Sequence, residues 1–268
     1  MVRKLPIWKT VTKSYGGAMS TLAGLRWYSL FAFLAILGFS EVQAFWNLVL
    51  MHGLMAGKIG PGNAMKVIST VIGPAFVGTI LVTPYLIEIH QEVLIREREK
   101  TNYFSRFAEK RTWVFAIWAT VIYFTVFHLP RGVVAASTQS LIQLPIVTVI
   151  GSILFVVGPI LIVRFFLVFP GIAIGARRIN FSYSWKITKG NTWRLIIIFV
   201  IAFLPFGVIV FVIVGFRRLL GDSLAGQLSL DVVSAVIAML AGLLMARVLS
   251  LTLKDRVNAL RAKQNARA

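Results

Sequence analysis

The chain has 268 residues, of which 58% are hydrophobic and only 14% are charged. Soluble domains carry about a quarter charged residues, so this composition predicts an all-α integral membrane protein. Cysteine is absent, which excludes disulfides, thiolate metal sites and cysteine nucleophiles. The net charge of +19 could indicate nucleic acid, but its cations cluster between apolar runs, and we expect no nucleic-acid partner.

Apolar runs of membrane-spanning length follow one another along the chain. Each is near the ~20 residues that a helix needs to cross the hydrocarbon core. The runs lie at about 27–48, 67–89, 113–129, 146–169, 195–216 and 232–253. Basic segments flank them, at 1–26 and at 254–268. The sequence therefore predicts one transmembrane domain, residues 27–253, built as a bundle of about six helices.

Charge placement orients the predicted bundle. Lysines and arginines are concentrated at 1–26, 96–111, 177–194 and 254–268, and the positive-inside rule places such segments in the cytoplasm. Both termini are therefore expected on the cytoplasmic side. The sequence Val42-Gln43-Ala44 resembles a signal-peptide cleavage site. The charged region before it is far longer than in signal peptides, so we expect the first run to remain as a span.

The stretch SYSWKITKGNTWRL, residues 182–195, is basic and aromatic, and it contains no acid. Helical spacing places Ile174, Phe181 and Trp185 on one face, and Arg177, Asn180 and Ser184 on another. This pattern predicts a short interfacial amphipathic helix, closed by a Gly190 C-cap, with Thr192 capping the next span. The residues expected to contact anionic phospholipid or a membrane partner are Arg177, Arg178, Phe181, Trp185, Lys186, Lys189, Trp193 and Arg194.

A longer run around this stretch, residues 164–199, resembles a known family. The residues that carry the resemblance are Arg164, Pro170, Ser184, Trp185, Thr188, Gly190 and Trp193. In this order they are similar to the YciC-like proteins and to the membrane domain that accompanies some glycerophosphoryl diester phosphodiesterases. Ile187 stands where the family usually has leucine, and an acid often found after the proline is missing. The resemblance implies a multi-pass protein of the bacterial inner membrane, without the phosphodiesterase domain.

Catalytic residues are scarce, because the chain has only three histidines and nine acids. Glu88 and Glu92 are four residues apart, so they share a helical face beside His90 and could hold a divalent cation. We favour a solvated helix end, with these acids paired to Arg96 and its neighbours. The following run, 96–111, alternates in charge and is typical of a solvated helix. No nucleophile, zinc or phosphate-loop motif occurs, so we expect no enzyme, cofactor or metal.

Charges inside the predicted spans are the remaining candidates for function: Glu41, Glu88, Arg164 and Arg247. Arg164 could reach the headgroups or pair with Glu88. Prolines inside several runs predict kinks, which would also suit a small transporter or channel. We favour a non-catalytic envelope module that contacts anionic phospholipid or a membrane partner, with transport as the alternative.

Overall fold

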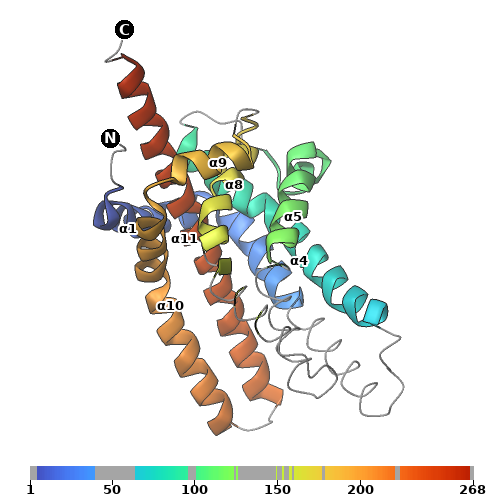
Figure 1. The fold of residues 1–268 in the computed structure, drawn as a ribbon. Coiled ribbons are helices and arrows are strands. Elements are labelled where there is room, and N and C mark those ends of the chain that lie inside the picture. Colours follow the sequence, from blue (N-terminus) through green and yellow to red (C-terminus); the bar gives the residue numbers. More distant parts are fainter. Residues whose placement is uncertain are drawn as a thin grey trace.

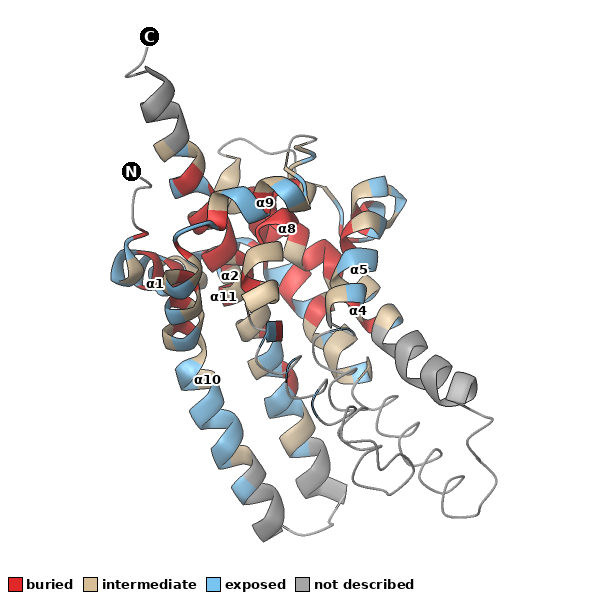
Figure 2. Ribbon diagram, in the orientation of Figure 1, coloured by how far each residue is buried: buried red, intermediate tan, exposed pale blue. Residues whose placement is uncertain are grey.

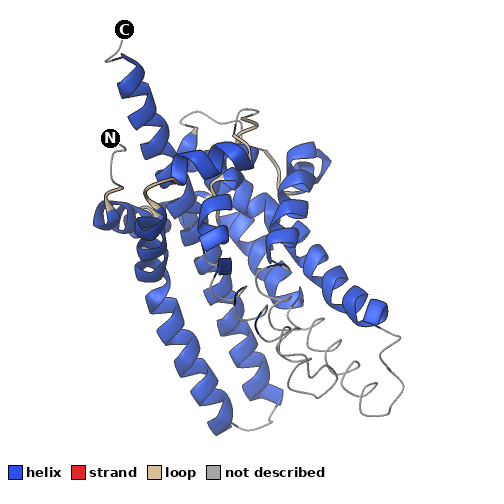
Figure 3. Cartoon of the chain, in the orientation of Figure 1, coloured by secondary structure: helices blue, strands red, loops and turns tan. Residues whose placement is uncertain are grey.

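A computed structural model describes residues 5–39, 64–95, 101–123, 160–176, 179–220 and 224–265, and positions 125, 149, 153, 157 and 158. Side chains are described in these ranges except at 64–75, 123, 214, 216–220, 224–228 and 260–265. All regular structure in the described residues is helical (Figure 3), which confirms the all-α fold class.

Two long helices run along the length of the molecule (Figure 1): α10 (Thr192–Leu220) and α11 (Leu224–Asn265). Within them, the segments Thr192–Ile213 and Ser229–Ala259 are long and apolar enough to cross a membrane. Large apolar side chains stand exposed along α10, including Leu204 at 61% and Phe211 at 80%. Because such a surface is unfavourable in water, α10 is suited to a lipid surrounding.

Helix α11 is much longer than the predicted sixth span. Its 42 residues correspond to about 63 Å at 1.5 Å per residue, roughly twice the ~30 Å hydrocarbon core. The helix continues through Asn265 and projects beyond the rest of the bundle at its C-terminal end (Figure 1). The predicted basic tail, 254–268, continues α11 as helix through Asn265, and its assignment as a separate segment stays a prediction.

The N-terminal basic segment is folded across one end of the bundle. It forms α1 (Ile7–Gly16) and α2 (Ala18–Gly24), which are followed by the helix Arg26–Phe39. The chain bends by 95° between Ile7–Gly24 and Arg26–Phe39. If this bent pair counts as one span, the described helices long and apolar enough to cross a membrane number three.

The remaining described helices pack around α11. Helix α4 (Ala64–Leu94) lies between α11 and α5 (Lys110–Tyr123), and η2 (Phe104–Ala108) precedes α5. An apolar helical stretch, Ile160–Ala173, ends in α8 (Val168–Ala173), which packs on α4 and α5. Each predicted apolar run thus contains described helix, but residues 40–63 and 126–148 lie outside the described residues. Six crossings stay a prediction.

Among the residues whose side chains are described, the buried ones are concentrated at the end of the bundle that carries α1 and α2 (Figure 2). One apolar cluster joins α1, α10 and α11 and includes Val11, Ile198 and Leu244. A second cluster joins the helix Arg26–Phe39 to α4 and α11 through Tyr28, Tyr85 and related side chains. The polar residues described below lie among these clusters.

The segment between α8 and α10 differs from its prediction. Helix α9 is short (Phe181–Thr188) and is capped by Asn180, whose side-chain oxygen accepts a hydrogen bond from the Tyr183 amide. Gly175 adopts a φ of +68°, which ends the preceding helix. One continuous helical face from Ile174 to Trp185 is therefore wrong. Gly190 has a φ of +78° just after α9, which confirms its predicted place at the helix C-terminus.

Candidate functional site

A buried ion pair links α4 to the segment before α5. Arg106, which is only 1% exposed, donates from Nε to Glu88 Oε1 at 2.8 Å, and its Nη2 donates to the same oxygen. Nη2 also donates to Gln91 Oε1 at 2.8 Å. The sequence predicted a solvated helix for this segment and a solvated end for α4. Both predictions are wrong for the described part, because Glu88, His90 and Arg106 are buried.

The same network extends to α8 and to the start of α5. Gln91 Nε2 donates to the backbone carbonyl of Ala173 at 2.8 Å, and Arg111 Nη1 donates to the same carbonyl at 3.3 Å. Glu109 lies between the two arginines and pairs with both Arg106 and Arg111. Glu109 and the two arginines thus join α4, α5 and α8.

Electrostatics at Glu109 follow from its arginine neighbours. Partial burial alone would raise the pKa of Glu109, but the hydrogen bonds and positive charges of Arg111 and Arg106 outweigh it. The pKa of Glu109 is therefore lowered below its ordinary value. Burial raises the pKa of Tyr103, whose hydroxyl donates to the Leu81 carbonyl. Tyr103 thereby holds the segment 101–109 against α4, and Glu109 joins Arg106 to Arg111.

A second polar cluster lies where α4 faces α2 and α11. Thr21 donates to Glu92 Oε1 at 3.1 Å and accepts a hydrogen bond from Arg247 Nη1. Arg247 also donates from Nε to the Ser14 carbonyl at 3.1 Å. His90, on another face of α4, lies 2.7 Å from the Ser250 hydroxyl through Nδ1. Arg247 thereby holds α1 and α2 onto α11.

A third cluster surrounds Arg164. Its guanidinium carbon lies 4.0 Å from the Trp185 ring centroid, and its Nε donates to Thr192 Oγ1 at 3.0 Å. Ser184 is buried and donates to the Arg164 carbonyl. Arg164 therefore contacts α9 and the start of α10, and of its two expected roles the pairing with Glu88 is wrong, because Glu88 pairs with Arg106. Thr192 begins α10 and accepts from Arg164, and its capping of the α10 amides stays a prediction.

The first described residues contact the start of α10. The Leu5 amide donates to Asn191 Oδ1 at 3.0 Å, and Arg194 Nη1 donates to the Leu5 carbonyl at 2.9 Å. Arg194, predicted as a lipid contact, therefore has a structural partner. Trp193 beside it is 72% exposed, and Phe181 packs on Trp118 with ring centroids 4.5 Å apart.

Exposed tryptophans and cations recur around this end of the molecule. Trp8 is 70% exposed, Trp27 62%, Trp113 44% and Trp185 39%. The exposed Lys9 follows Trp8 in the sequence, and the exposed Arg26 precedes Trp27. The Arg26 guanidinium lies 5.9 Å from the Trp27 ring centroid. We define the belt as these side chains with their exposed cations: Trp8, Lys9, Lys13, Arg26, Trp27, Trp113, Trp185, Lys186, Lys189 and Trp193.

Not every predicted site residue can be placed. Arg177, Arg178 and Glu41 lie outside the described residues. Lys186 and Lys189 are exposed on α9 and just after it. Sequence reasoning missed Arg106 as a buried partner and treated Arg26 only as a topological charge. The adjacent Arg26-Trp27 pair at the start of an apolar run was the available signal.

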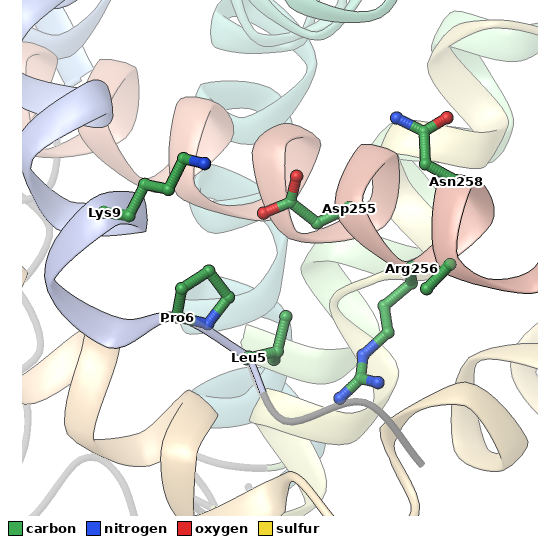
Figure 4. A pocket seen from close by; sticks show the side chains of 7 residues that line it. Leu5, Pro6, Lys9, Asp255, Arg256 and Asn258 are labelled. Atoms are coloured by element: carbon green, nitrogen blue, oxygen red, sulfur yellow. The ribbon is translucent and has the colours of Figure 1, made fainter. Parts of the chain in front are cut away.

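A pocket of about 200 Å³ lies between the start of α1 and the C-terminal part of α11. Leu5, Lys9, Asp255 and Asn258 line it, and the Lys9 and Asp255 side chains point toward one another (Figure 4). Arg256 also lines this pocket, so two cations and one acid face it. The start of α1 and the projecting part of α11 lie at the same end of the bundle.

Neither a metal site in the described part of the chain nor a similar protein of known function points to the role of these residues. Among the described residues, no group of three or more histidines and acids is placed to hold a metal ion. No family model, curated protein or solved structure matches the chain. Its function is therefore inferred from its own residues. The exposed tryptophans of the belt suit a membrane–water interface, and its cations can bind anions. The buried charges join helices.

Proposed function

We propose that the protein is a non-catalytic membrane module whose basic face binds anionic phospholipid. The observation that carries this proposal is the belt, in which exposed tryptophans stand beside exposed lysines and arginines. Tryptophan favours the headgroup level of a bilayer, and each cation near an anionic surface contributes about 1 kcal/mol. Both preferences are met by one lipid surface.

The internal charges support a structural role over a catalytic one. Glu88 pairs with Arg106, Arg164 contacts Trp185 and Thr192, and Arg247 donates to Ser14. Each contact joins separate helices and compensates a charge that would be costly alone. The alternative, a small transporter or channel, draws on these same charges, and flux through proteoliposomes carrying Arg164→Met would test it.

The topology and family remain part of the proposal. We infer six spans with both termini in the cytoplasm of a bacterial inner membrane, which would place the belt at the cytoplasmic leaflet. Membership of the YciC-like family is proposed from the sequence pattern that includes Arg164, Ser184, Trp185 and Gly190. A membrane-protein partner could dock on the same face as the lipid.

Brominated lipids that quench tryptophan fluorescence test the lipid-binding proposal. The purified full-length chain is reconstituted in phosphatidylcholine containing brominated phosphatidylglycerol, and its quenching is compared with that by brominated phosphatidylcholine. We expect stronger quenching by the anionic lipid. Replacing Lys9, Lys13, Lys186 and Lys189 with glutamine should reduce the difference, whereas replacing them with arginine should keep it. Equal quenching of the wild type by both lipids would refute the proposal.

A further inference from the structure

The corner between α2 and the helix Arg26–Phe39 carries two hollows with a shared border. One is an apolar groove of about 480 Å³, and the other is a cavity of about 430 Å³ with polar and aromatic walls. Arg26 lines both. The 95° bend at this corner places the end of one helix and the beginning of the next around the same arginine.

The groove has the chemistry of an acyl-chain site. Its walls include Leu22, Leu30, Phe33 and Met239. Met239 belongs to Ser229–Ala259, the part of α11 that is long and apolar enough to cross a membrane. A groove on such a helix is exposed to lipid tails, and the flexible methionine can adapt its wall to a chain.

The adjoining cavity has the chemistry of a headgroup site. Tyr28, Phe31 and Tyr103 form aromatic walls, and Asn102 contributes an amide. Glu88 also lines the cavity, but its charge is compensated by the buried Arg106. Arg26 therefore leaves the border of the two hollows with a net positive charge. A guanidinium matches the paired oxygens of a phosphodiester.

We propose that this corner binds one anionic phospholipid, with an acyl chain in the groove, the phosphodiester at Arg26 and the headgroup in the cavity. The inference rests on the proposed lipid-binding function and deepens it, because it assigns a discrete site to one lipid molecule. The acyl chain and the phosphate of one molecule are covalently joined, as the two hollows are joined at Arg26. Neither a soluble anion nor a detached chain would fill both.

Native mass spectrometry of the full-length protein, supplied with phosphatidylglycerol in mild detergent, tests the site. We expect the wild type to retain one lipid. Arg26→Gln should weaken the affinity for this lipid about tenfold, the loss expected for a charge-assisted contact of about 1.5 kcal/mol, and so lower the one-lipid fraction. Ala23→Trp should produce a similar loss with Arg26 intact, because Ala23 lines the groove and the indole would occupy it.

Two matched variants separate the site from general effects. Lys13→Gln removes another exposed belt cation, and Val200→Trp adds an indole to an exposed position on α10; both should keep the lipid. The site is overturned if Arg26→Gln and Ala23→Trp, with unchanged melting temperatures, retain lipid as the wild type does. If the wild type retained phosphatidylethanolamine as well as phosphatidylglycerol, the preference for an anionic headgroup would be wrong.

The same variants distinguish this inference from the proposed function. If the site alone is wrong, Arg26→Gln and Ala23→Trp keep the retained lipid, while the wild type still shows stronger quenching by brominated phosphatidylglycerol. If lipid binding itself is wrong, the wild type shows neither retained lipid nor any quenching preference.

Discussion

Arg106 and Glu88 form an ion pair whose side chains are each only 2% exposed, although they are 18 residues apart in the chain. Burying either charge alone would cost several kcal/mol, since the loss of hydration is not repaid without a partner. Gln91 accepts a second hydrogen bond from Nη2, and Glu109 accepts one from Nη1 of the same guanidinium. The pair therefore fixes the segment before α5 against α4.

Removing the positive partner should be costly. Arg106→Met leaves the Glu88 carboxylate buried without its cation and is expected to destabilise the protein by about 3–5 kcal/mol. Adding Glu88→Gln removes the stranded charge and should recover part of the loss. Denaturant unfolding in detergent measures both. Arg111→Met is the control, because Arg111 is 34% exposed, and its loss should cost about 1 kcal/mol or less. An Arg106→Met cost as small as that of the control would contradict a buried pair.

The contact between Arg164 and Trp185 should show energetic coupling. At 4.0 Å from the ring centroid, the guanidinium is placed for a cation–π interaction worth about 0.5–2 kcal/mol. A double-mutant cycle with Arg164→Met and Trp185→Leu measures this coupling through unfolding free energies. The exposed pair Arg26 and Trp27, at 5.9 Å, is the reference and should couple more weakly. Additive effects at Arg164 and Trp185 would show that the stacking contributes nothing.

Two neighbouring glycines at the end of α1 should respond oppositely to substitution. A Cβ at Gly17 would lie 1.7 Å from Arg247 Nη2, whereas one at Gly16 would meet nothing within 4 Å. Gly17→Ala must displace Arg247 from Ser14 and Thr21, at an expected cost of about 1–3 kcal/mol. Gly16→Ala should be neutral or slightly stabilising. Thermal unfolding of the two variants checks this, and equal melting temperatures would argue against the Arg247 contacts.

Acid should weaken the structure partly through Glu109. Its pKa is lowered in the folded protein, so the folded state favours the carboxylate more than the unfolded state does. This stabilisation is complete well above the ordinary value of 4.5 and is lost as the pH falls towards the lower folded pKa. Melting temperatures between about pH 3 and 7 should fall less steeply for Glu109→Gln than for the wild type. Parallel curves would contradict the shift.

Helix positions were predictable because apolar runs are local. The fifth and sixth predicted runs lie inside α10 and α11, where a continuous lipid-facing surface requires a continuous apolar sequence. Gly190 was predictable for a similar reason, since a left-handed residue after a helix favours glycine. The contacts of Arg164 with Trp185 and Ser184 join residues that the sequence pattern groups.

The buried polar contacts were not predictable from spacing. Helical spacing relates Glu88 to a residue four positions away, whereas its partner Arg106 lies in a short 3₁₀ helix further along the chain. The run around Arg106 has the alternating charge of a solvated helix, and only its packing against α4 changes that interpretation. The corner at Arg26 likewise depends on a 95° bend, which neither hydropathy nor charge specifies.

The central claim, binding of anionic phospholipid, is tested most directly by the lipid that accompanies the protein. The full-length chain is purified in mild detergent, and its phospholipids are compared with the total extract of the same membranes. We expect a higher proportion of anionic lipid with the wild type, reduced to the proportion in the extract when Lys9, Lys13, Arg26, Lys186 and Lys189 are replaced by glutamine. A wild-type lipid composition equal to that of the extract would contradict the claim.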